Sequence, residues 1–172
     1  MTTAIPDNPN GPSVPSRRAG DVITTALITV FILGFFMRIW RFHPHIPLVY
    51  EGDGTANLSL FTNMKGHWSY FSSSHLGYPY GQHLQDAPAP ADGLCLAWSW
   101  LLVNLTRDAV LAVNTFFLSS YPLTAVGGMI GARLAGLHRR SSIALGVLYA
   151  FLPFHWMHGA AHLYLSMYPV IP

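Results

Sequence analysis

Two carboxylates lie close together in the segment LVYEGDGTANLSL, residues 48–60. Glu51 and Asp53 are flanked by glycines, in a chain of 172 residues that contains only 7 Asp and Glu. A carboxylate can accept a proton from an attacking hydroxyl group, and glycine lets a ligand approach the backbone closely. The segment is therefore a candidate catalytic or binding loop. Gly-Asp-Gly is also typical of a solvent-exposed turn, and this alternative stays open.

A second group of polar and aromatic residues lies in GYPYGQHLQDAPAPADG, residues 77–93. Its Pro and Gly content predicts an irregular loop. Tyr80, His83 and Asp86 are the candidate ligand-binding side chains of this loop. A loop of this composition at a membrane face can hold a polar ligand such as a sugar. Simple packing of the loop explains the same residues equally well.

Three histidines occur in PFHWMHGAAHLYLSMYP, residues 153–169. His155, His158 and His162 have the spacing i, i+3 and i+7, so a helix would place them on one face. Three histidines could bind zinc or iron, but the segment contains no carboxylate that would complete such a site. Contact with a substrate phosphate or sugar, and packing at a membrane interface, are the other interpretations. We expect no metal ion and no other cofactor.

The composition identifies the environment of these groups. The chain is 51% hydrophobic and 9% charged, whereas soluble domains carry about 25% charged residues. We therefore predict an integral membrane protein whose partner is the lipid bilayer. The net charge of +2 and the absence of a basic run argue against a nucleic-acid partner. The single Cys95 excludes an internal disulfide and is interpreted as a small buried apolar residue.

Hydropathy divides the chain into a tail, spans and loops. Residues 1–20 are rich in Pro, Gly, Ser and Asn and are predicted to be a disordered cytoplasmic tail. Residues 21–172 are predicted to be the N-terminal part of a transmembrane domain, and the uncharged end MYPVIP leads us to expect a longer protein. The predicted spans are residues 22–40, 109–133 and 143–157, and the predicted outer loops are residues 41–108 and 158–172.

Basic residues predict the orientation of these spans. Arg17 and Arg18 precede the first span, and Arg139 and Arg140 precede the third, so both pairs are predicted to be cytoplasmic. The loop 41–108 is then extracytoplasmic. Within this loop, residues 94–105 are too few for a span and are predicted to form a short interfacial helix. Arg38 and Arg41 disagree with this orientation, because the rule places few arginines outside.

The order of these motifs resembles the N-terminal part of the C-type (GT-C) membrane glycosyltransferases. The resemblance covers about residues 20–172. It rests on one span, an acidic GD motif in the first outer loop, YPYG with a Pro-rich acidic stretch, an interfacial Trp helix, a second span that ends in basic residues, and FLPFHWMHGAAHLYLSMYPVIP. The resemblance implies an all-α polytopic fold with a long first extracytoplasmic loop that contains short interfacial helices. Because it is to bacterial members of this family, it also implies a bacterial plasma membrane with the active face outside.

The resemblance also implies an activity. Such enzymes take a sugar from a polyprenyl-phosphate-linked donor and transfer it to an acceptor at the outer membrane face. The first-loop acid acts as general base or orients the acceptor, which assigns this role to Asp53 and makes Glu51 a weaker candidate. A second outer loop supplies another polar residue in several branches, here His158 or His162. Some members bind a divalent metal at the acid and many need none.

The leaving phosphate in this reaction develops negative charge and needs a cation nearby. Arg41 or a protonated histidine of the second outer loop is the candidate for this role. The alternative functions are a polytopic transporter or lipid flippase, and a structural subunit. A transporter is expected to place ionisable residues inside its spans, and the three predicted spans contain no acid. This observation favours chemistry in the outer loops.

Overall fold

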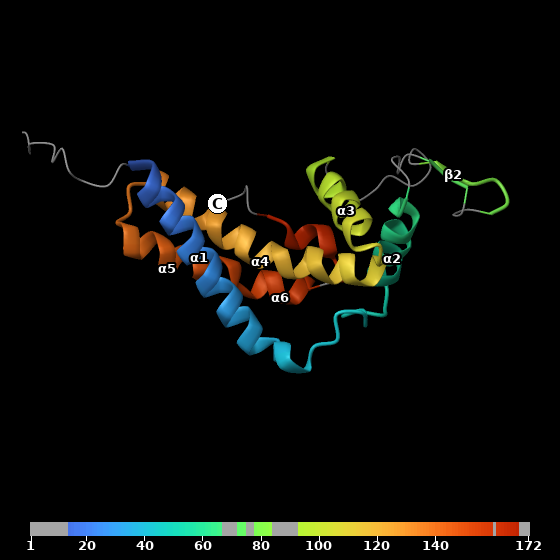
Figure 1. The fold of residues 1–172 in the computed structure, drawn as a ribbon, viewed down its shortest axis with the longest axis horizontal. Helices are drawn as coiled ribbons and strands as arrows, with labels where there is room; N and C mark the ends of the chain where they lie inside the picture. The colour runs from blue at the N-terminus through green and yellow to red at the C-terminus, as the bar shows by residue number, and fades with distance from the viewer. Residues whose placement is uncertain (1–13, 67–71, 75–77, 84–92, 160, 169–172) are drawn as a thin grey trace, which may run out of the picture.

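The computed structural model describes residues 14–66, 72–74, 78–83, 93–159 and 161–168 (Figure 1). These residues form an all-helical chain apart from one pair of two-residue antiparallel strands, which confirms the predicted all-α class. The α-helices are α1 (Val14–Phe36), α2 (Asp53–Met64), α3 (Gly93–Thr106), α4 (Ala109–Leu134), α5 (Arg139–Ala150) and α6 (Pro153–His158), the 3-10 turns are η1 (Ile39–Arg41) and η2 (Leu163–Ser166), and the strands are β1 (Ser72–Ser73) and β2 (Gln82–His83).

Both ends of the first span differ from the prediction. Helix α1 begins at Val14, inside the segment predicted to be a disordered tail. Pro15 is compatible with this, because the first turn of a helix needs no hydrogen bond from that position. Helix α1 ends at Phe36 instead of reaching residue 40, because Arg38 adopts a left-handed conformation with φ of 49°. Residues 19–36 remain long and apolar enough to cross a membrane.

Helix α1 buries polar side chains and exposes apolar ones. Thr25 and Thr29 are fully buried, and each hydroxyl donates to a backbone carbonyl one turn earlier. Leu27 and Phe31, in contrast, are 64% and 76% exposed. Water would disfavour such an outer surface, whereas hydrocarbon favours it. This distribution agrees with a lipid-facing helix that packs on its neighbours through small and polar residues.

Helix α4 is the second helix that is long and apolar enough to span a membrane. Its bounds reproduce the predicted span at 109–133 to within one residue. Helix α5 packs along it, and Gly146 makes the closest approach. A Cβ atom added at Gly146 would lie 2.3 Å from the carbonyl oxygen of Ala125, and one at Gly128 would lie 2.9 Å from the ring of Tyr149. Small residues thus allow the two backbones to touch.

The predicted third span, residues 143–157, is not one continuous helix. Helix α5 ends at Ala150 and α6 begins at Pro153. Proline disfavours the helical conformation of the residue before it, and Leu152 accordingly has ψ of 147°. Helix α5 has 12 residues and is about 18 Å long, which is shorter than a hydrocarbon layer of about 30 Å. Two helices of membrane-spanning length are therefore present among the described residues.

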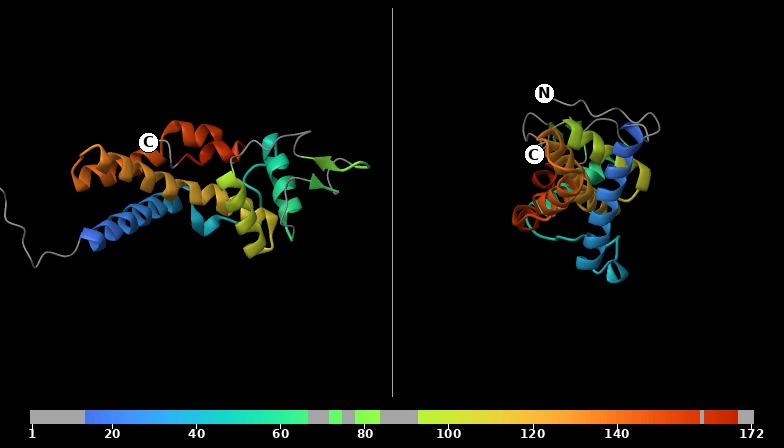
Figure 2. Two further views of the ribbon diagram at one scale, coloured as in Figure 1. Left: turned by 90° about the horizontal axis from the view of Figure 1, so that it is seen from above. Right: turned by 90° about the vertical axis from the view of Figure 1, so that its left-hand side faces the viewer.

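The helices are arranged around α4. Helices α1 and α5 pack along α4, while α2 and α3 pack near its N-terminal end, with the β-hairpin beyond them (Figures 1 and 2). Arg139, at the start of α5, forms an ion pair with buried Asp21 near the start of α1. The N-terminal ends of α1 and α5 therefore lie together, at the far end of α4 from α2 and α3. The predicted orientation requires this separation of the basic residues from the first outer loop.

The orientation can be tested by labelling single cysteines introduced at Ser74 and Ser141, both of which are exposed. Cys95 is first replaced by Ala, so that each variant has one thiol. We expect an impermeant thiol reagent to label the Ser74→Cys variant in intact cells and to label Ser141→Cys only after the membrane is permeabilised. Equal labelling of both variants in intact cells would contradict the orientation predicted from the basic residues.

Candidate functional site

The structure brings together two candidate residues that lie far apart in the sequence. Asp53 is the first residue of α2, and His162 immediately precedes η2. The Nδ1 atom of His162 lies 3.1 Å from Oδ2 of Asp53. The side chain of Asp53 is 66% exposed and that of His162 is 48% exposed, so a ligand can reach both. The two outer loops of the sequence prediction therefore meet at an Asp–His pair.

This pair borders a cleft of about 460 Å³ between α2 and η2. The side-chain amide of Asn57 donates a hydrogen bond of 3.2 Å to the carbonyl oxygen of Ala161 and ties the two walls together. The cleft therefore combines a carboxylate, an imidazole and an amide with apolar surface, as ligand sites commonly do. The residues that line it are Asp53, Ala56, Asn57, Leu60, Ala161, His162, Leu163, Tyr164 and Leu165.

The glycines around Asp53 shape the backbone. Gly52 has φ of 54°, a conformation that other residues rarely adopt, and it turns the chain into α2. A Cβ atom at Gly54 would lie 2.9 Å from Cγ1 of Val49, so Gly54 lets α2 pack against the preceding segment. The glycines therefore fix Asp53 at the N-terminus of a helix, where the helix dipole favours negative charge. Asp53 is thus the first residue of a helix, and the turn lies just before it, at Gly52.

Aromatic side chains pack the two walls of the cleft, α2 and η2, against α4. The ring of Phe116 on α4 makes edge contacts with Phe61 on α2 and Tyr164 on η2, with centroid distances of 6.0 and 5.6 Å. All three side chains are buried. Burial also raises the pKa of Tyr164 to about 12. Tyr164 is therefore a neutral phenol at physiological pH, which leaves Asp53 and His162 as the proton-accepting side chains among the lining residues.

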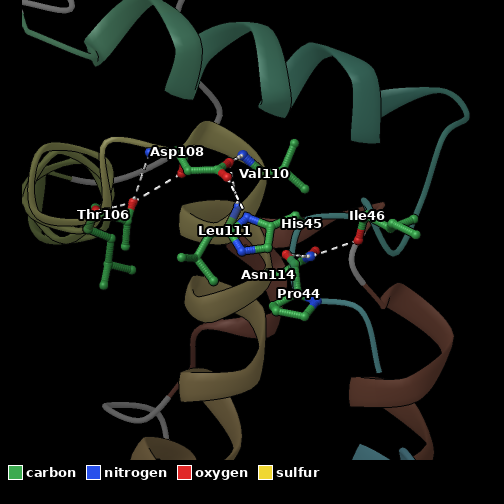
Figure 3. A network of polar contacts seen from close by, with 9 residues as sticks. Pro44, His45, Ile46, Thr106, Asp108, Val110, Leu111 and Asn114 are labelled. Carbon is green, nitrogen blue, oxygen red and sulfur yellow. Dashed lines mark hydrogen bonds and ion pairs between the residues drawn. The ribbon is translucent and has the colours of Figure 1, made fainter. Parts of the chain in front are cut away.

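Polar contacts hold the segment before Asp53 against the start of α4 (Figure 3). Asp108 caps α4 by accepting hydrogen bonds of 2.8 and 3.1 Å from the backbone amides of Val110 and Leu111. The same carboxylate contacts Nδ1 of His45 at 2.6 Å. The hydrogen bond from His45 is the main reason that the pKa of Asp108 is lowered. This contact joins the first outer loop to the helix on which the cleft is built.

Asn114 on α4 makes a second set of hydrogen bonds to the segment before Asp53 (Figure 3). Its side-chain amide donates to the carbonyl oxygens of Pro44 and Ile46 at 2.8 and 2.9 Å, and its oxygen accepts from the amide of Leu48 at 3.3 Å. Asn114 is 1% exposed, so these bonds are shielded from water. The sequence analysis missed both Asn114 and His45. A lone Asn in an apolar span is the signal that could have identified the first of them.

The comparisons with known proteins found no relative of this chain. No protein-family model, curated protein or solved structure matches it. The resemblance to the C-type glycosyltransferases therefore stays a prediction from short motifs, and the geometry of the cleft has to support any functional assignment.

The prediction that three histidines share one helical face is wrong. Helix α6 ends at His158 because Gly159 has φ of 49° and turns the chain. His162 lies beyond this turn and faces Asp53, whereas His155 is fully buried. The side chain of His158 lies outside the described part of the structure. Among the described residues, no group of three or more His, Cys, Asp or Glu side chains is arranged to hold a metal ion.

His155 belongs to a buried polar contact between α4 and the C-terminal segment. Its ring stacks on Tyr121, with centroids 3.9 Å apart. The hydroxyl of Ser120 donates to the carbonyl oxygen of Phe117 and lies 2.7 Å from Nε2 of His155, so Nε2–H donates to it. The hydroxyl of Tyr168 lies 3.2 Å from Nδ1. Both ring nitrogens therefore have partners, and His155 holds α6 on α4.

The other predicted site residues whose side chains the structure describes do not line the cleft. Glu51 is exposed in the turn before α2. Arg41 belongs to η1 and borders a different hollow. Tyr80 is 92% exposed, and His83 lies on β2 in the hairpin beyond α2. Asp86 lies outside the described residues. Among the described candidates, only Asp53 and His162 line the cleft.

Proposed function

We propose that this chain is part of a membrane glycosyltransferase that takes a sugar from a polyprenyl-phosphate-linked donor. The supporting observation is the contact between Asp53 and His162 at the edge of a cleft of about 460 Å³. The reaction needs a base for the hydroxyl proton and a cation near the leaving phosphate. The carboxylate of Asp53 can serve as the base, and the imidazole of His162 is a cation when it is protonated. The motif order described above supports the choice of sugar transfer over other reactions that need the same two groups.

The proposed reaction is a direct displacement at the anomeric carbon. The acceptor hydroxyl oxygen forms a bond to that carbon, and the bond from the carbon to the phosphate oxygen breaks with its electron pair on the phosphate. The hydroxyl proton passes to the carboxylate of Asp53. General base catalysis of this kind needs the carboxylate within hydrogen-bond reach of the hydroxyl, and the 66% exposure of Asp53 permits such an approach.

His162 has one of two roles in this scheme. A protonated His162 orients Asp53 through Nδ1 and offers positive charge to the leaving phosphate. Alternatively, neutral His162 accepts the proton at Nε2 while Asp53 holds the ring through Nδ1, which is the arrangement of His and Asp in hydrolase triads. We favour the first role, because Asp53 is held in the first turn of helix α2, whereas His162 lies in a connecting turn.

The position of the cleft suits a lipid-linked donor. It lies beside the N-terminal part of α4, one of the two helices that could span a membrane. A polyprenyl tail could remain in the bilayer along such a helix while its phosphate and sugar enter the cleft at the surface. Leu60 and Leu165 supply apolar surface on the cleft walls, which can pack against the first isoprene units or a sugar face.

The test uses membrane vesicles that contain the full-length protein and a panel of polyprenyl-phosphate sugars with a radioactive sugar. We expect one donor to lose its sugar, with release of one polyprenyl phosphate for each sugar transferred. Vesicles without the protein are the control. Movement of the intact donor across the bilayer, with no cleavage of the sugar–phosphate bond, would instead identify a flippase. If no donor in the panel is cleaved and none crosses the bilayer, the proposed donor class is contradicted.

A further inference from the structure

A second polar site lies at the end of α1, apart from the cleft. After α1 ends, the left-handed conformation of Arg38 turns the chain, and η1 follows. This turn brings the side chains of Arg38 and Arg41 to the border of one open hollow of about 570 Å³. Aromatic residues form the rest of the border. The lining residues are Phe35, Phe36, Arg38, Trp40 and Arg41.

The charges in this hollow have no counterion among the described residues. In the part of the chain that the structure describes, neither Arg38 nor Arg41 forms an ion pair, whereas Arg139 is paired with Asp21. The neighbouring aromatics Phe35 and Trp40 are each 65% exposed and contact each other edge to face at 6.5 Å. Two cations without a described counterion beside exposed aromatic rings, at the end of an apolar helix, are complementary to an anionic group with an apolar part.

We propose that this hollow binds the headgroup phosphate of a net-anionic phospholipid. The proposal rests on α1 crossing a bilayer and is independent of the glycosyltransferase assignment. A guanidinium group matches a phosphate oxygen pair in shape and charge, and Trp residues prefer the headgroup level. The acyl chains then lie along the exposed apolar face of α1 at Phe31 and Phe35. A zwitterionic headgroup fits less well, because its own cation already compensates its phosphate.

This site also explains the two arginines that disagree with the predicted orientation. Basic residues are depleted outside because orientation follows the cytoplasmic excess of Lys and Arg. Arg38 and Arg41 lie at the opposite end of α1 from the Asp21–Arg139 pair, which is the end predicted to face outward. An anionic lipid in the outer leaflet neutralises them there. Arg41 is therefore assigned to a structural lipid, separate from the donor phosphate at the Asp53 cleft.

The experiment measures lipid binding by the full-length protein in mild detergent, by native mass spectrometry with added phosphatidylglycerol or phosphatidylcholine. We expect wild-type protein to retain phosphatidylglycerol preferentially. Arg41→Gln should weaken its binding about fivefold, the effect of about one surface cation. Arg41→Lys should restore part of it. Arg107→Gln is the matched control, because Arg107 is also exposed and has φ of 56° but does not border the hollow. It should bind as wild type does.

Three results would overturn the proposal. Equal losses in Arg41→Gln and Arg107→Gln would show general attraction of the basic surface for anionic lipid. Equal retention of phosphatidylcholine and phosphatidylglycerol by the wild type would remove the argument from charge. Full displacement of the lipid by millimolar inorganic phosphate would identify a site for free phosphate, because the acyl chains would then contribute nothing to binding.

Discussion

Asp53→Asn is expected to reduce sugar transfer by about 10²–10⁴-fold, the range for loss of a general base. The substitution keeps the shape of the side chain but removes its ability to take a proton. It also keeps an acceptor oxygen near His162. Asp53 is 66% exposed, so the free energy of unfolding should change by less than about 0.5 kcal/mol. The measurement is the rate of label transfer in vesicles, normalised to protein level.

Two variants make this result specific. Glu51→Gln is the matched control, because Glu51 is an exposed acid in the same segment that does not line the cleft. It removes the same charge and should retain most activity. His162→Gln separates the two proton-transfer schemes. If His162→Gln lowers the transfer rate much less than Asp53→Asn does, the base is Asp53. If it lowers the transfer rate as much or more, the base is His162. Normal transfer in Asp53→Asn would exclude Asp53 from the mechanism.

His155→Ala is expected to lower the free energy of unfolding by about 3–5 kcal/mol, as truncation of large buried side chains does. The variant removes a ring that is fully buried and stacked on Tyr121. It also leaves the hydroxyl of Ser120 without the imidazole donor and the hydroxyl of Tyr168 without its ring-nitrogen partner. Thermal or denaturant unfolding of purified protein in detergent measures the effect.

His43→Ala provides the comparison for this variant, since His43 is exposed and its removal should change stability by less than about 0.5 kcal/mol. His155→Ala should also slow sugar transfer, because α6 leads into the turn that carries His162. Wild-type stability in His155→Ala would mean that α6 is held on α4 by its apolar contacts alone.

Sequence patterns predicted one of the long helices, α4, closely. The uncharged run at residues 109–133 differs from α4 by one residue, because burial in hydrocarbon requires both length and apolarity. The helix at 94–105 was also confirmed, as α3. The breaks were harder to predict. The left-handed turn at Arg38 has no sequence signal, because residues other than glycine rarely adopt a positive φ. The division of the segment after Ala150 depends on the single residue Pro153.

The site was only partly predictable for a related reason. Asp53 and His162 were each identified by residue type and by their place in the outer loops, but their contact depends on how α2 and η2 pack on α4. Helical periodicity grouped His155 with His162, and Gly159 separates them. Asn114 is the lone Asn of an apolar span, but no local pattern indicates its hydrogen-bond partners. Its hydrogen bonds reach residues about 70 positions away.

The buried Asp21 has a consequence for biogenesis. Its partner Arg139 lies 118 residues later in the chain. At the usual rates of synthesis, roughly 10 s pass between the appearance of the two residues at the ribosome. During that interval Asp21 lacks the arginine with which it is paired in the folded chain. The contact between the starts of α1 and α5 can therefore form only after α4 and the start of α5 have been made. The final packing of α1 against α5 is thus expected to follow the synthesis of both later helices.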